Sequence, residues 1–284
     1  RDLTEAINKY MWHAGQGAYF AYNVKSNQLD EKLIAYTFDP LKMNIAPADR
    51  TKKMLALLTD HTYFNWDGNT VTSAAKTDRT YNETTGIYNG APAWSGDIWT
   101  LRNEAIIQGL QDIGRYDLAA ELSLKTVNLV NGKYTEFFKP SDGSGHGVKR
   151  YAWTAAQYIQ IIIENIFGID YNAFQKTITI RPNLDQSLKD KQLSLEKLKL
   201  PDGGILNVQL LKKNNSTTIN YSTSGLHPEM KVLVSLPVNH PNKCTGALLN
   251  DKTVKVITET KKTSKLYHVH PGTAPGNQII FTVK

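Results

Sequence analysis

The spacing of hydrophobic residues changes near residue 170, and this change limits what the chain can fold into. Before it, apolar residues recur at helical spacing. After it, they alternate with polar residues, as in strands that are buried on one face. The change falls within residues 166–182 (IFGIDYNAFQKTITIRP), which indicates a domain boundary. We therefore predict an α+β multidomain protein, helical over residues 1–170 and all-β over residues 171–284.

The first part is predicted to contain a small hairpin at residues 17–30 and several amphipathic helices. Asp117 is expected to cap the fourth helix and Gly168 to end the fifth. The second helix should carry His61 on the same face as Met54. The five helices are expected at residues 2–12, 48–64, 98–113, 118–130 and 155–166.

In the second part, short alternating segments are separated by turn residues such as Asp-Gly, Asn-Asn and Ser-Gly. Strands at this spacing are typical of a β-sandwich. We expect strands at residues 176–182, 192–200, 205–213, 216–224, 231–238, 253–260, 265–271 and 278–284.

The composition argues against several classes of protein. The net charge is +7, but Lys and Arg are spread along the chain, so we expect a basic surface and no nucleic-acid partner. The single cysteine, Cys244, allows no intrachain disulfide and no thiolate zinc cluster. No membrane span, metal site or cofactor is expected from the motifs present. Because the chain begins at Arg1 without a signal peptide, we expect it to start inside a longer precursor.

Two segments combine aromatic side chains with polar ones. In residues 88–110, Trp94 and Trp99 flank a Ser-Gly turn, and Asn103 follows on a helix. Indole faces suit sugar rings, although both tryptophans could equally belong to the core. In residues 132–154, Glu136 lies on an expected loop among aromatic residues, where a carboxylate can act in acid–base catalysis. His146 in this segment is expected to be a surface residue.

The motifs W-S-G-D-I-W-x-x-x-N, E-x-F-x-P and W-T-A-A occur in this order at residues 94–103, 136–140 and 153–156. Together they resemble the C-terminal part of the catalytic barrel of the trehalase-like glycoside hydrolases, which include processing α-glucosidase and mannosylglycerate hydrolase. The β region resembles the sandwich that follows the barrel in several bacterial members.

The resemblance implies an (α/α)6 toroid of helical hairpins and an exo-acting hydrolase that inverts configuration, on an α-linked glucoside or mannoside. It also implies that Glu136 is the general base. The implied substrate-binding residues are Trp94, Gly96, Trp99, Asn103 and Trp153. No metal is implied.

The family's general acid is an aspartate in a segment upstream of every motif found here. Asp67 is a poor candidate for it because of its place in the order of motifs, and Asp97 is a poor candidate because it occupies a variable position of its motif. A toroid needs twelve helices, and the sequence predicts five. We therefore expect the chain to be the C-terminal portion of a longer enzyme, with the upstream polypeptide as its partner and a glycoside or oligosaccharide as its substrate. A periplasmic or secreted bacterial enzyme is the expected setting.

Two other functions stay open on the residues alone. The aromatic side chains could grip sugar in a non-catalytic carbohydrate-binding or structural module. An α/α-toroid polysaccharide lyase would use a Tyr, His and Arg set, and His146, Arg150 and Tyr151 are close in the sequence.

Overall fold

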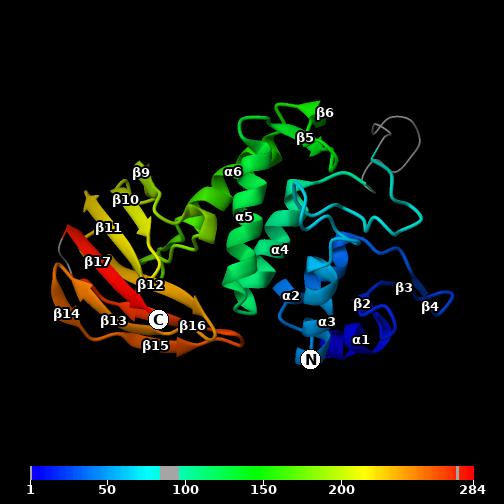
Figure 1. Cartoon of the computed structure of the whole chain (residues 1–284), viewed down its shortest axis with the longest axis horizontal. Coiled ribbons are helices and arrows are strands. Elements are labelled where there is room, and N and C mark those ends of the chain that lie inside the picture. Colours follow the sequence, from blue (N-terminus) through cyan, green and yellow to red (C-terminus); the bar gives the residue numbers. More distant parts are fainter. Residues whose placement is uncertain (1, 84–95, 273–274) are drawn as a thin grey trace. The chain divides into compact units, whose positions relative to one another are not determined.

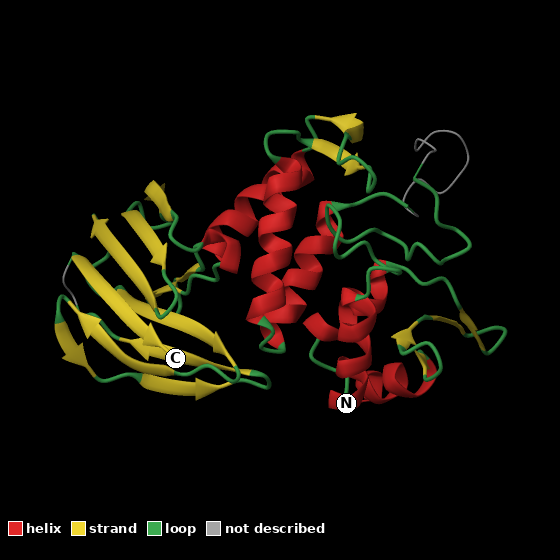
Figure 2. Ribbon diagram, viewed as in Figure 1, coloured by secondary structure: helices red, strands yellow, loops and turns green. Residues whose placement is uncertain are grey.

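The computed structural model of the chain describes residues 2–83, 96–272 and 275–284 (Figure 1). It combines helices and strands, as predicted (Figure 2). The contacts define two compact units. Unit 1 comprises Arg1–Ile113 and Leu122–Ile159, and unit 2 comprises Gly114–Glu121 and Gln160–Lys284. The division into domains at residues 1–170 and 171–284 stays a prediction.

All five predicted helices are confirmed. The middle three bury apolar residues in the core, whereas the first contains no buried residue and the last leaves Trp153 and Ile159 exposed. On the fourth α-helix along the chain, for example, Ile107 and Leu110 are fully buried. The α-helices are α1 (Asp2–Tyr10), α2 (Asp39–Lys42), α3 (Ala48–Thr59), α4 (Thr100–Asp112), α5 (Tyr116–Val130) and α6 (Ala152–Gln160). The other helical turns are η1 (Ala35–Phe38), η2 (Ile161–Ile166) and η3 (Gln186–Leu188).

One end of each of two predicted helices, those of α3 and α5, differs from the prediction. Helix α3 ends at Thr59, because Asp60 turns to an extended backbone and accepts hydrogen bonds from Thr62. His61 is therefore exposed outside the helix. Helix α5 begins at Tyr116, so Asp117 lies in its first turn and is not the N-cap. The last helix changes to a π-helical turn at η2 before Gly168, whose φ of 66° ends it as predicted.

Unit 2 contains two large sheets that are consistent with a β-sandwich. The six-stranded sheet has the order β14-β13-β17-β11-β10-β9, and the five-stranded sheet has the order β15-β16-β12-β8-β7. Only β12 and β8 pair in parallel among these neighbours. The strands are β7 (Ile169–Asn172), β8 (Thr177–Ile180), β9 (Gln192–Lys199), β10 (Ile205–Lys212), β11 (Ser216–Ser224), β12 (Lys231–Asn239), β13 (Cys244–Leu249), β14 (Lys252–Val254), β15 (Ile257–Thr260), β16 (Ser264–Val269) and β17 (Gly276–Val283).

Alternation along these strands buries one face of each sheet, which is the physical basis of the period of two in the sequence. Fully buried apolar side chains come from both sheets, and burying each one contributes roughly 1.5–3 kcal/mol. They include Leu206, Val208, Ile219, Ile279 and Phe281 from one sheet and Ile178, Ile180 and Val234 from the other.

Three details of the β region were not predicted correctly. Strand β7 was missed, because the first expected strand began at residue 176. The segment 253–260 is divided between β14 and β15, which belong to different sheets. Strand β13 was missed, because Thr245 and Gly246 interrupt its apolar residues and its register with β17 shifts between Cys244 and Gly246.

Unit 1 contains three short ladders: β1 (Trp12–His13) with β2 (Ala18–Tyr19), β3 (Ala21–Asn23) with β4 (Gln28–Asp30), and β5 (Thr135–Phe138) with β6 (Gly145–Lys149). The hairpin predicted at residues 17–30 is confirmed by β3 and β4. The first predicted helix was too long, because Trp12 and His13 leave it and pair with β2.

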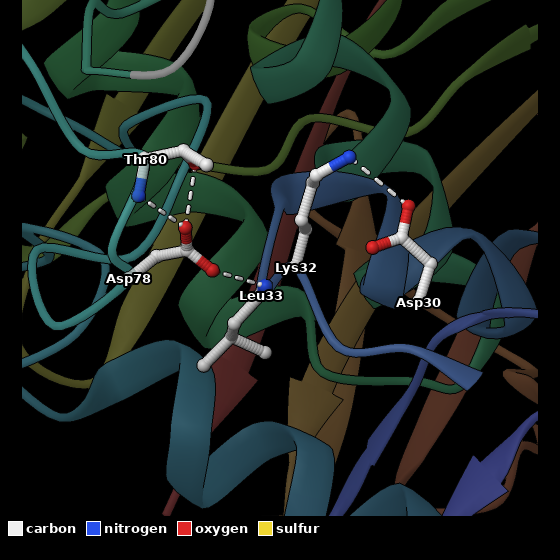
Figure 3. A network of polar contacts seen from close by, with 5 residues as sticks. All are labelled: Asp30, Lys32, Leu33, Asp78 and Thr80. Atoms are coloured by element: carbon white, nitrogen blue, oxygen red, sulfur yellow. Dashed lines mark hydrogen bonds and ion pairs between the residues drawn. The ribbon is translucent and has the colours of Figure 1, made fainter. Parts of the chain in front are cut away.

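One carboxylate joins two distant loops of unit 1. Asp78 accepts a hydrogen bond from the backbone N–H of Leu33 at 2.6 Å, and from the N–H and hydroxyl of Thr80 at 2.8 and 2.5 Å (Figure 3). Burial raises the pKa of Asp78, but these hydrogen bonds outweigh it and leave that pKa below its ordinary value. The ionised side chain therefore holds the segment after β4 against the loop at residues 75–81.

Candidate active site

Glu136 was predicted to lie on a loop, but it lies on strand β5. The register of the β5–β6 hairpin shifts between Thr135 and Phe137, so that Glu136 faces two residues of β6, Gly147 and Val148. This is a β-bulge, a feature that re-aims side chains near functional sites. The half-buried Glu136 accepts a hydrogen bond on Oε2 from the backbone N–H of Val148 at 3.3 Å.

Backbone and hydroxyl contacts join this hairpin to the neighbouring elements. Ile98 and Phe138 exchange backbone hydrogen bonds of 2.8 and 3.1 Å, which fix the segment before α4 beside β5. At the start of α6, the Thr154 hydroxyl donates to the carbonyl of Thr135 at 2.8 Å. Strand β5 is therefore held from both sides, by residues that belong to the two flanking sequence motifs.

Four rings gather around the strand; we call them the aromatic group: Trp99, Phe137, Tyr151 and Trp153. The Trp99 ring centroid lies 6.0 Å from that of Phe137 and 6.2 Å from that of Trp153. Tyr151 packs edge-on against Trp153 at 5.9 Å. Trp99 is only 7% exposed, whereas Trp153 is 55% exposed. An exposed indole on a buried one provides a face on which a sugar ring can stack.

Tyr151 links the carboxylate to the aromatic group. Burial, followed by the negative charge of Glu136, raises the pKa of the Tyr151 hydroxyl. The two side chains are therefore close enough to interact electrostatically. The structure thus brings three of the predicted site residues, Glu136, Trp99 and Trp153, into one neighbourhood.

The other predicted site residues are placed differently. Trp94 lies outside the described residues. Gly96 is buried where a β-carbon would lie 2.3 Å from the backbone of Asn82, so close packing demands glycine there. Asn103 is fully buried and donates from Nδ2 to the Thr70 hydroxyl at 2.9 Å. A direct contact of Gly96 or Asn103 with substrate stays a prediction.

The structure also contains an acid–base pair that sequence reasoning missed. His146 on β6 places Nε2 3.0 Å from Oδ1 of Asp97, whose side chain is fully buried. Burial raises the pKa of Asp97 to about 6, against the opposing effects of His146 and Lys139, and Glu83 raises it further. His146 is half-buried and was wrongly expected on the surface. Asp97 and His146 are far apart in the chain and share no sequence motif, so their contact could not be predicted from the sequence.

The remaining acidic and histidine side chains that the sequence offered as candidates do not form a second catalytic site or a metal site among the described residues. Asp67 is exposed in a turn. His268 places Nδ1 2.7 Å from the hydroxyl of buried Ser235 and Nε2 3.3 Å from Glu259. Burial lowers the pKa of His268 despite Glu259. Among the described residues, no three His, Cys, Asp or Glu side chains are grouped so that they could hold a metal ion.

Comparison with known proteins supports the resemblance seen in the motifs. The chain is 27% identical to the mannosylglycerate hydrolase of Rubrobacter radiotolerans over 165 residues, which are 58% of this chain and 36% of that protein. It is 28% identical to the periplasmic trehalase of Escherichia coli O8 over 130 residues, 46% of this chain and 20% of that protein. The chain thus spans well under half the length of these relatives.

A solved structure with a similar fold is the α-L-rhamnosidase of Dictyoglumus thermophilum. It aligns with 99% of this chain and 28% of its own, with a TM-score of 0.58 and 13% identity. None of the helices among the described residues has the length and hydropathy needed to cross a bilayer. The sequence profile of the mannosylglycerate hydrolase MGH1-like glycoside hydrolase domain matches residues 1–154, and the chain therefore belongs to this family of glycoside hydrolases.

Proposed function

We propose that this chain supplies the general-base side of the active site of an inverting glycoside hydrolase. The observation that carries the proposal is the position of Glu136 on β5, opposite the bulge in β6, where its negative charge raises the pKa of Tyr151 in the aromatic group. A carboxylate held in this way can take a proton from a water molecule that attacks the anomeric carbon.

The aromatic group suggests how the sugar binds. Trp153 offers an exposed indole face, and buried Trp99 supports it from behind. Trp94 is proposed to complete the wall of the same subsite. The neighbouring hydroxyl of Tyr151, protonated at neutral pH, can donate a hydrogen bond to a sugar oxygen or to the attacking water.

The general acid is proposed to come from polypeptide upstream of this chain, which would also complete an (α/α)6 toroid. An inverting enzyme needs two carboxyl groups roughly 6.5–9.5 Å apart. Among the described residues, Glu136 is the one carboxylate for which we propose a catalytic role, so we expect the chain by itself to be inactive. The proposed substrate is an α-linked glucoside or mannoside, cleaved from its end. The periplasmic trehalase relative supports a periplasmic or secreted setting.

The stereochemistry of the product tests this function directly. The full-length protein that contains this chain would be mixed with an α-glucoside or α-mannoside, and the first anomer released would be followed by proton NMR. The proposal expects the β-anomer to appear first, because water attacks opposite the leaving group. Initial release of the α-anomer would contradict inversion, and no hydrolysis of any α-glycoside would contradict the proposed reaction.

A further inference from the structure

The positive charge of the chain is concentrated in unit 2. Unit 2 contains 17 Lys and Arg against 11 Asp and Glu, an excess of 6, whereas unit 1 contains 16 against 15. The net charge of +7 is therefore not a property of the whole surface, as the sequence suggested, but of the unit built from the two large sheets.

Much of this charge surrounds one hollow of about 670 Å³ in unit 2. Its walls come from the start of α5, the segment after β12 and the turn between β15 and β16. We call it the basic hollow, and its charged lining residues are Arg115, Lys243, Lys261, Lys262, Lys265 and Asp117. Five permanent cations thus face a single carboxylate.

Some of the cations are already compensated. Arg115 pairs with Asp117 at 2.6 Å, and Lys261 pairs with Glu259 outside the hollow at 2.5 Å. Lys243 and Lys265 are exposed, and no ion pair involves either of them in the part of the chain that the structure describes. Lys243 and Lys265 therefore add positive charge to the hollow that an anion could neutralise.

Protection of a sheet edge does not explain the arrangement. Lysines on edge strands prevent pairing with other molecules, and β15 is an edge strand. However, Arg115 lies beside a helix, and Lys243 immediately precedes β13, an inner strand of the other sheet. Cations that converge on one hollow from three separate segments indicate a binding site.

The remaining lining residues identify the class of anion. The hollow contains amide and hydroxyl side chains, among them Asn239, Asn242 and Thr260, which suit sugar hydroxyls. The only ring among its described lining residues is the imidazole of His240, and no Phe, Tyr or Trp is present to give the larger stacking faces that single-stranded nucleic acids use. Its one aliphatic side chain, Val238, offers too little apolar surface for insertion into a membrane.

We propose that the basic hollow binds the acidic groups of an anionic polysaccharide, with Lys243 and Lys265 as the principal contacts. Carboxylate and sulfate groups share the required chemistry. The volume matches that of pockets that hold small molecules, and so it fits a few sugar units of a longer chain. This site is separate from Glu136 and would hold the protein on its polymer whether or not that polymer is hydrolysed.

The test is equilibrium binding by the 284-residue chain. Fluorescently labelled oligogalacturonate and heparin fragments provide carboxylate and sulfate probes, dextran is the neutral probe, and anisotropy is read at 50 and 200 mM salt. We expect at least one acidic probe to bind, dextran not to bind, and affinity to fall as salt rises. K243E/K265E should weaken binding at least tenfold. The matched control K191E/K255E changes the same charge at exposed lysines outside the hollow and should weaken it less than threefold.

Three outcomes would overturn the proposal: no acidic probe binds at 50 mM salt, both double variants weaken binding equally, or single-stranded nucleic acid or anionic vesicles bind as tightly as the acidic sugars. Circular dichroism would check that each variant is folded. If charge reversal prevents folding, K243Q/K265Q removes the charges more gently and should still weaken binding at least threefold. Binding requires no turnover, so a negative result leaves the role of Glu136 untouched, and the reverse also holds.

Discussion

Nε2 of His146 lies 3.0 Å from Oδ1 of Asp97, a carboxylate with no exposed surface. The next residue, Ile98, exchanges backbone hydrogen bonds with Phe138 on the other strand of the same hairpin. Two consecutive residues before α4 therefore hold both strands of the hairpin that carries Glu136. The Asp97–His146 pair therefore helps to hold the hairpin that carries the proposed base.

Asp97→Asn should change how stability depends on pH. Burial raises the pKa of Asp97 from 3.8 to about 6 in the folded protein, so folding favours the protonated carboxyl. This contribution is complete below pH 4 and is lost as the pH rises through 6, by roughly 3 kcal/mol at most. Denaturant unfolding at several pH values should show Asp97→Asn gaining stability relative to the wild type between pH 4 and 7.

Groups on several elements face Asp97: His146 on β6, Lys139 after β5, and Glu83. Because Asp97 is not the only charged group there, the difference between variant and wild type is the quantity to follow. Asp67→Asn removes a charge from an exposed turn and is the matched control. A difference that stays flat with pH, or falls as the pH rises, would contradict the assignment of a raised pKa to Asp97.

Asp78→Ala should destabilise the protein more than Asp60→Ala. Both carboxylates accept hydrogen bonds from the N–H and hydroxyl of a threonine two residues later, but only Asp78 also accepts from a distant residue, Leu33. That bond to a charged acceptor contributes about 1–2 kcal/mol, reduced here by partial exposure. Thermal unfolding at neutral pH measures the difference between the variants.

The stability that Asp78 contributes should depend on pH with the opposite sign to that of Asp97. The pKa of Asp78 is lowered in the folded protein, so its contribution is present above the ordinary pKa of aspartate and is lost as the pH falls through the folded value. The gap between wild type and Asp78→Ala should therefore close in acid. A gap that stays constant down to pH 2 would show that the hydrogen bonds of the ionised carboxylate are not its source.

Trp153→Ala and Trp99→Ala should separate binding from stability. Trp153 is 55% exposed, so its removal should change the free energy of unfolding little while raising KM severalfold through loss of the stacking face. Trp99 is 7% exposed, and its truncation should cost about 3–5 kcal/mol of stability through the cavity it leaves. Equal losses of stability in the two variants would contradict the roles given to the rings.

Local patterns were enough to predict the helices and most strands, because each depends on the spacing of apolar residues within one segment. The bulge at Glu136 was not predictable, since it depends on the register of two strands that Gly147 and Val148 set together. The Asp97–His146 pair and the basic hollow join residues that are distant in the sequence. The charged residues can be identified in the sequence, but only the folded structure shows that they lie close together.

The motifs identified the neighbourhood of the site better than the role of each residue. Glu136, Trp99 and Trp153 lie near one another, as the motifs suggested. Asn103 is instead enclosed in the core with Thr70, and Gly96 is explained by the close backbone of Asn82. A sequence motif contains residues needed for packing as well as residues needed for chemistry. The buried positions of Asn103 and Gly96 indicate that they belong to the first group.

The central claim is that Glu136 is the general base, and steady-state kinetics of Glu136→Gln in the full-length protein test it most directly. The amide keeps the shape of the side chain but cannot accept the proton, so kcat should fall about 10²–10⁴-fold while KM changes little. Glu31→Gln is the matched control, since it makes the same change at an exposed carboxylate of the same unit. Activity of Glu136→Gln within threefold of the wild type, in a protein shown to be folded, would contradict the account.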